Sequence, residues 1–133
     1  MVNIIYKEGT NINAEELSQL FISSGIKRPS NDLNRLQRMI ENSDIIFTAW
    51  YQEKLVGIAR AITDFSYCCY LSDLAVSLEY QKSGIGSELV RLLQEHIGEE
   101  VSLLLLASPT AMDYYPRIGF EAIDNGFKIS RKR

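Results

Sequence analysis

One segment near the middle of the chain constrains the fold more than any other. Tyr67 to Val76 has the composition of a strand, and a polar segment with two glycines, Gln81-Lys82-Ser83-Gly84-Ile85-Gly86, follows it. Apolar residues then recur at helical spacing up to Ile97, and the apolar run Val101 to Leu106 comes next. A strand, a helix and a second strand in this order predict a parallel crossover, which is right-handed in nearly all proteins.

The other elements follow from local signals. Asn13 with Glu16 predicts a capped helix that ends at Gly25, and a second helix is expected after Ser30. The segments expected to be strands are Ile4-Ile5, the hairpin pair Asp44 to Tyr51 and Leu55 to Ile62, and Phe127 to Ser130. Val101 to Leu106 is almost wholly apolar, so we expect a strand covered on both faces. Ser108-Pro109 predicts the cap of a short helix.

Length and charge exclude several classes of protein. The 133 residues fit a single domain, 1–133, of α/β or α+β class with a mixed sheet. The net charge of −3 argues against a nucleic-acid partner, and Arg131-Lys132-Arg133 is expected to be a solvated end, with a phosphate contact as the minority alternative. No apolar run approaches the ~20 residues of a membrane span, and no secretory signal is visible.

The two cysteines, Cys68 and Cys69, are adjacent. Adjacent side chains diverge on a strand, so they cannot form a useful intrachain disulfide, and they lack the spacing of metal ligands. No metal is therefore expected, and a cytoplasmic location fits best.

The glycine segment predicts an anion site. The first amides of a helix have no partners within the helix, and glycines let a ligand approach the backbone closely. A phosphate or pyrophosphate is the natural ligand, and a glycine turn that only joins strand to helix is the alternative. The Walker A pattern fails because the lysine precedes both glycines, and the Rossmann pattern fails because the third glycine is missing.

At this point the sequence resembles the GNAT superfamily of N-acetyltransferases. Gln81, Gly84 and Gly86 match its Q/R-x-x-G-x-G/A motif, and Tyr115, followed by Gly119 and Phe120, matches its second motif. The resemblance implies a mixed sheet of about six to seven strands flanked by helices. It also implies acetyl-CoA as cosubstrate, a small-molecule or peptide amine as acceptor, direct attack in a ternary complex and, because members often dimerise, a homodimer.

The resemblance places the cosubstrate between the strands at Tyr67 to Val76 and Val101 to Leu106. The pyrophosphate would lie on the backbone amides of the loop, and the pantetheine arm would pair with the edge of the preceding strand. The residues implied as its contacts are Leu74, Ala75, Val76, Gln81, Lys82, Ser83, Gly84, Ile85, Gly86 and Ser87.

Tyr115 is the acid that the resemblance implies. A phenol close to the leaving thiolate could protonate it. A packed aromatic residue is the alternative, and Tyr114 could exchange roles with Tyr115. Pro116 disfavours helical geometry in the residue before it, so the helix could end or kink there.

Asp73 is the candidate base, with a polar strand residue that binds a cation or backbone group as the alternative. Asp64 is a candidate contact of the acceptor, with a loop cap as the alternative. The resemblance implies that the segment from Phe21 to Ser30, which includes Arg28 and Pro29, sets acceptor specificity. Tyr70 is a further candidate contact, with a packing residue as the alternative. The rival interpretations are a CoA-binding module without turnover and an interaction protein whose loop binds no nucleotide.

Overall fold

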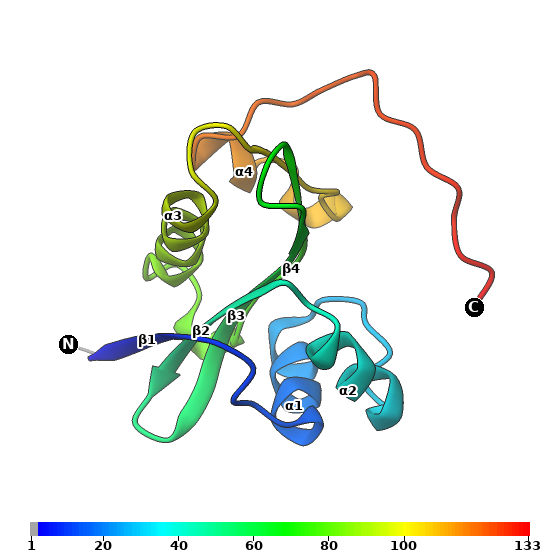
Figure 1. The fold of residues 1–133 in the computed structure, drawn as a ribbon. Helices are drawn as coiled ribbons and strands as arrows, with labels where there is room; N and C mark the ends of the chain where they lie inside the picture. Colours follow the sequence, from blue (N-terminus) through cyan, green and yellow to red (C-terminus); the bar gives the residue numbers. More distant parts are fainter. Residues whose placement is uncertain (1–2) are drawn as a thin grey trace.

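The computed structural model describes residues 3–133 as one mixed β-sheet with helices on both faces (Figure 1). The strands are β1 (Ile4–Glu8), β2 (Ile45–Tyr51), β3 (Lys54–Thr63), β4 (Cys68–Val76) and β5 (Ser102–Leu104). The helices are α1 (Ala14–Ser24), α2 (Leu33–Glu41), α3 (Ile85–Ile97) and α4 (Tyr114–Arg117), with 3-10 turns η1 (Leu78–Tyr80) and η2 (Pro109–Ala111).

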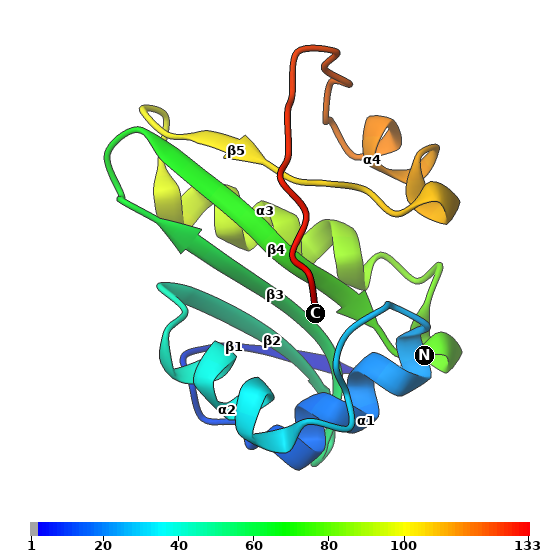
Figure 2. The ribbon, with the colours of Figure 1, turned by 90° about the vertical axis from the view of Figure 1, so that its right-hand side faces the viewer.

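The strands lie in the order β1-β2-β3-β4-β5 (Figure 2). Neighbours are antiparallel as far as β4, and β4 pairs with β5 in parallel after the chain has crossed through α3. The predicted parallel connection between these two strands is therefore confirmed.

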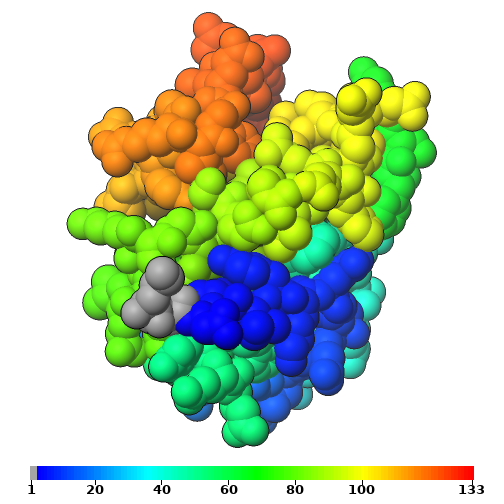
Figure 3. Space-filling model, turned by 90° about the vertical axis from the view of Figure 1, so that its left-hand side faces the viewer, coloured from blue at the N-terminus to red at the C-terminus, as the bar shows by residue number. Residues whose placement is uncertain are grey.

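Helices cover the two faces of the sheet separately. In Figure 1, α3 lies on one face, and α1 and α2 lie on the other; Figure 3 views the molecule from the α3 side. Leu89 and Leu93 of α3 are fully buried in one apolar cluster, and Leu17 and Phe21 of α1 are fully buried in a second. The predicted capping box of α1 forms, because Asn13 accepts from the Glu16 amide at 2.8 Å while Glu16 accepts from the Asn13 amide at 3.1 Å.

The last part of the chain differs from expectation. β5 is only three residues long, and its residues alternate between exposed and half-buried. The prediction of a strand covered on both faces is wrong because β5 is the edge of the sheet, so an apolar run here does not signal full burial. Ser108 makes no capping hydrogen bond, and the segment after it is a 3-10 turn.

Phe127 to Ser130 forms no strand, so in the part of the chain that the structure describes the sheet has five strands rather than six to seven. Within residues 3–133, no helix is both long and apolar enough to cross a bilayer.

We expect Leu89→Ala to lower the free energy of unfolding by about 2–5 kcal/mol, because it removes a fully buried side chain between α3 and the sheet. Leu78→Ala is the control, since that leucine is 68% exposed, and it should change stability by no more than about 0.5 kcal/mol. Urea denaturation measures both values. Equal losses in the two variants would contradict the packing described for α3.

Candidate active site

β4 and β5 pair over only three residues each. The pairs are Cys68 with Ser102, Cys69 with Leu103 and Tyr70 with Leu104, and β4 then continues to Val76 without β5 beside it. Leu74, Ala75 and Val76 pair with β3 on one side, and within residues 3–133 they have no strand on the other side. The backbone of this half of β4 is therefore available to an extended ligand.

The loop after η1 leads directly into the first turn of α3. Gly84 is left-handed, with φ of 88°, and Lys82 is also left-handed, with φ of 65°. The first amide of this helix to find a backbone acceptor is that of Glu88, which donates to the Gly84 carbonyl at 3.0 Å. The amides of Ile85, Gly86 and Ser87 precede it, and no acceptor for them is found within residues 3–133. Such donors, together with the helix dipole, favour an anion.

Two side chains of the loop form hydrogen bonds to the backbone that stabilise its conformation. Gln81 donates from Nε2 to the Val76 carbonyl at 2.8 Å, and the Ser83 hydroxyl donates to the Tyr80 carbonyl at 2.5 Å. These contacts tie the loop to the end of β4 and to η1. The backbone, rather than the Gln81 or Ser83 side chain, is therefore the part left for a ligand.

A tyrosine of α4 lies directly against the start of α3. A Cβ built on Gly86 would lie 2.4 Å from the Tyr114 hydroxyl and 3.9 Å from a methyl of Leu74. A side chain at position 86 would therefore have to displace this phenol. Burial raises the pKa of Tyr114 above its ordinary value, so this hydroxyl keeps its proton at neutral pH.

Tyr115 packs edge-on between two other rings. Its ring centroid lies 5.3 Å from that of Tyr114 and 5.4 Å from that of Phe120. Burial is the main cause that raises the Tyr115 pKa; Tyr114 adds to the rise, and the charge of Arg28 opposes it. Pro116 does not break α4. It lies in the first turn of the helix, where a backbone N–H would have no acceptor within the helix, so the missing N–H of proline costs no hydrogen bond.

The most buried charge of the region is the carboxylate of Asp73. Arg28 donates from Nε to its Oδ1 and Arg60 donates from Nε to its Oδ2, each at 2.5 Å. Asp73 is fully buried, whereas the Arg28 side chain remains 27% exposed. Arg28 also donates to the Ser72 carbonyl at 2.7 Å, so it joins the loop between α1 and α2 to β4. Sequence reasoning missed Arg60, although a lone arginine inside an apolar strand was a usable signal.

A β-bulge explains how Asp73 meets these arginines. Arg60 pairs with Asp73 and Ala61 pairs with Leu71, so Ser72 has no partner on β3. One extra residue reverses the alternation of a strand. Leu71 consequently packs in the cluster beside α3, whereas Ala75 packs in the cluster beside α1 and α2, and Asp73 faces the same side as Ala75.

Two other expected contacts lie at the opposite end of β4. The Asp64 carboxylate accepts from the amides of Ser66, Tyr67 and Cys68 at 2.8–3.1 Å. These hydrogen bonds lower the pKa of Asp64 and match the loop-cap alternative. Tyr70 is partly exposed in the last pair between β4 and β5, at the point where the strands diverge.

Comparison with known proteins decides the family. The model of the acetyltransferase (GNAT) domain matches residues 12–129. The chain belongs to the GNAT acetyltransferase family. It is an acyltransferase, as its relatives are. The protein named uncharacterized N-acetyltransferase ycf52 of Pyropia yezoensis is 32% identical over 133 residues, which cover 95% of this chain and 75% of that protein.

Solved GNAT structures share the fold. A protein of meticillin-resistant Staphylococcus aureus superposes with a TM-score of 0.81 at 23% identity, covering 98% of this chain and all of that one. The aminoglycoside N-acetyltransferase AAC(6')-Iy in complex with CoA superposes with a TM-score of 0.73 at 14% identity, covering 100% of this chain and 97% of that one. At these identities the superpositions establish the fold alone.

We expect Asp73→Asn to lower the free energy of unfolding by about 3–5 kcal/mol, because it leaves two guanidinium groups facing a neutral amide. Glu79→Gln is the matched control, since its ion pair with Lys54 is exposed and should be worth about 1 kcal/mol or less. Chemical denaturation at neutral pH measures both. A loss for Asp73→Asn no larger than that of the control would show that the buried pair carries little stability.

We expect Gly86→Ala to lower the free energy of unfolding by about 1–3 kcal/mol, because the new methyl overlaps the Tyr114 hydroxyl. Tyr114→Phe removes that oxygen and leaves the ring carbon 3.5 Å from the methyl, which is ordinary contact. The double variant should therefore regain most of the loss. Thermal and urea unfolding of the two single variants and the double variant test the contact, and strictly additive effects would contradict it.

Proposed function

We propose that this GNAT acetyltransferase transfers the acetyl group of acetyl-CoA to an amine by direct attack in a ternary complex. The observation that carries the proposal is the unpaired half of β4, which leads into the free amides at the start of α3. Acetyl-CoA has an extended arm that contains amides, and this arm fits the unpaired half of β4. It also has a pyrophosphate, which fits the free amides at the start of α3. We take residues 1–133 as one catalytic domain.

The backbone of this region fits the cosubstrate. The pyrophosphate would accept hydrogen bonds from the amides between Gly84 and Ser87, where a Cβ built on Gly84 would meet nothing within 4 Å and the backbone is open to a ligand. The pantetheine amides would pair with the open edge at Leu74 to Val76. Lys82 is exposed beside the loop and adds a positive charge close to the phosphates. When bound, acetyl-CoA supplies the activated thioester.

Tyr115 is the proposed acid. Its raised pKa keeps the phenol protonated at neutral pH, so a proton is available as the thiolate leaves. Burial also disfavours a charged thiolate, which makes the leaving sulfur a stronger proton acceptor. Tyr114 is the second candidate, but its hydroxyl lies against Gly86 and Leu74.

Asp73 is better suited to positioning than to proton transfer. Both of its oxygens already accept guanidinium donors, and no part of the residue is exposed to an incoming amine. We propose that Asp73 fixes Arg28 and, through it, the loop between α1 and α2 that borders the acceptor. The proton of the acceptor amine would then leave through water.

Both cysteine thiols are free, which suits the predicted cytoplasmic location.

A thiol-release assay with acetyl-CoA and a panel of amines tests the activity. Turnover with any amine supports the proposal. Stabilisation by CoA without turnover would favour the non-catalytic CoA-binding module, and the absence of any thermal shift with millimolar CoA would favour an interaction protein.

We expect Tyr115→Phe to lower kcat by about 10²–10⁴-fold while KM for acetyl-CoA changes little, because the ring stays and only the proton donor is lost. Tyr114→Phe is the matched control and should keep kcat within about threefold of wild type, since it leaves the proposed acid in place. Steady-state kinetics on both variants compare the two phenols. The reverse pattern would assign the acid to Tyr114.

A further inference from the structure

The cluster around Asp73 carries more positive than negative charge. Its single carboxylate is paired with two guanidinium groups, those of Arg28 and Arg60. Within residues 3–133, neither arginine forms an ion pair with a second acidic residue. The Arg60 side chain is 9% exposed, whereas that of Arg28 is 27% exposed. The excess positive charge therefore reaches solvent through Arg28.

Arg28 also keeps hydrogen-bond donors for a ligand. A guanidinium has one N–H on Nε and two on each terminal nitrogen. In Arg28, Nε donates to Asp73 and Nη2 donates to the Ser72 carbonyl. Nη1 donates to the Lys27 carbonyl at 2.5 Å. One N–H on each terminal nitrogen thus has no acceptor within the described residues, and such a pair of donors matches the two oxygens of a carboxylate.

The exposed side of Arg28 borders the expected position of the thioester. The loop that would bind the pyrophosphate follows β4, so the arm of acetyl-CoA would run back from Val76 and bring the thioester toward Ser72. Arg28 donates to the carbonyl of Ser72. Burial raises the pKa of Tyr115 and the charge of Arg28 opposes this rise, so the guanidinium acts on the proposed acid. An acceptor that reaches the thioester therefore meets this positive charge.

An exposed apolar surface lies on the same face of the sheet. Ile62 pairs with Tyr70 and Tyr70 pairs with Leu104, so the three side chains form a row across β3, β4 and β5. They are 42%, 39% and 46% exposed. Leu71 packs in the cluster beside α3, so Tyr70 faces the opposite side, where Asp73 also lies. The charge of Arg28 and this apolar row therefore belong to one surface.

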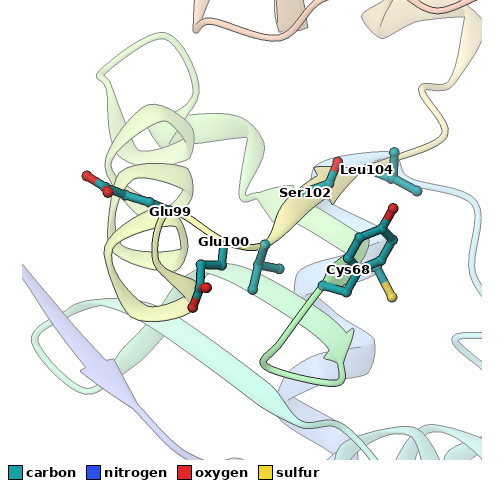
Figure 4. Close-up of a pocket in the computed structure, with 7 residues that line it drawn as sticks. Cys68, Glu99, Glu100, Ser102 and Leu104 are labelled. Atoms are coloured by element: carbon teal, nitrogen blue, oxygen red, sulfur yellow. The ribbon is translucent and has the colours of Figure 1, made fainter.

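A hollow of about 450 Å³ continues the surface past Leu104. In Figure 4, Cys68, Ser102 and Leu104 lie together on one side of the hollow, and the Glu99 carboxylate lies on the far side. Cys68 pairs with Ser102 two residues before the pair of Tyr70 with Leu104, so both pairs share one face. The volume falls within the ~300–1,000 Å³ of small-molecule sites, so a side group of the acceptor has room here.

We propose that the acceptor is an α-amino acid with an apolar side chain, whose carboxylate is bound by Arg28. This inference rests on the acetyl transfer proposed above and names its substrate class. The amine nitrogen bonds to the acetyl carbon and the carbon–sulfur bond breaks. One proton passes from the amine to water, and the leaving sulfur takes one from Tyr115.

Charge and position select this class of acceptor. One carboxylate neutralises the excess charge of the cluster, whereas a polyamine or an aminoglycoside would bring further positive charges to it. Arg28 lies beside the expected thioester, so the amine and the carboxylate must be close together in the acceptor. The row of Ile62, Tyr70 and Leu104 then receives the apolar side chain.

The first test compares acceptors that differ in one group. With the wild type and acetyl-CoA, kcat/KM for L-phenylalanine should exceed that for L-phenylalaninamide and for 2-phenylethylamine by about 10–100-fold, because both analogues lack the carboxylate. Spermidine, with several ammonium groups, should react no better than these analogues. Equal or faster turnover of the amines without a carboxylate overturns the substrate class and leaves acetyl transfer in place.

The second test removes the charge of Arg28. In Arg28→Gln, the preference for L-phenylalanine over its amide should fall to about twofold or less. Both acceptors are measured on one variant, so a smaller folded fraction does not alter their ratio. Arg38→Gln is the matched control, because Arg38 is exposed on α2 and its side chain forms no hydrogen bond within residues 3–133; it should keep the wild-type ratio. A preference that survives Arg28→Gln overturns the proposal.

Binding of the product needs no turnover, so it separates this proposal from the proposed function. In the presence of CoA, N-acetyl-L-phenylalanine should bind about 10–100-fold more tightly than N-acetyl-L-phenylalaninamide, as measured by calorimetry. Arg28→Gln should bind the two equally. Equal affinities in the wild type, or no binding of the acid, overturn the carboxylate site. An absence of turnover with every amine counts against the proposed function instead, and the binding data then decide the site alone.

Discussion

β4 and β5 share a parallel ladder only from Cys68 to Tyr70 and from Ser102 to Leu104. A longer ladder would have closed the backbone of β4 at the place where the proposed cosubstrate needs it. The same short ladder leaves β5 as a poorly covered edge with exposed leucines. A cosubstrate beside the open half of β4 would supply the pairing that the sheet itself lacks there.

The Asp73 carboxylate fixes the other wall of the site. Its two arginines come from β3 and from the loop between α1 and α2, so one buried charge joins the sheet to that loop. Burying a carboxylate is costly unless its hydrogen bonds are satisfied. Here both oxygens are satisfied, and the exposed part of Arg28 is the portion that the proposed acceptor would meet.

Local signals in the sequence were sufficient for much of the fold. The caps at Asn13 and Gly25 and the strand–loop–helix unit around Gly84 depend on residues close together in the chain, and all of them form as predicted. The environment of Asp73 could not be read in this way. Its partners lie 45 and 13 residues away, and the bulge at Ser72 decides which face it takes. The apolar pattern of β5 predicted burial, but a pattern does not reveal whether a strand lies at an edge.

The contact between Gly86 and Tyr114 joins two segments that are far apart in the chain. The phenol fills the volume that a side chain at position 86 would need, so the two positions share one space. In sequences that keep this arrangement, a larger residue at position 86 either displaces the phenol or is accompanied by a smaller residue at position 114. The pair should therefore covary during evolution, although neither position could be recognised as dependent on the other from the sequence of this chain.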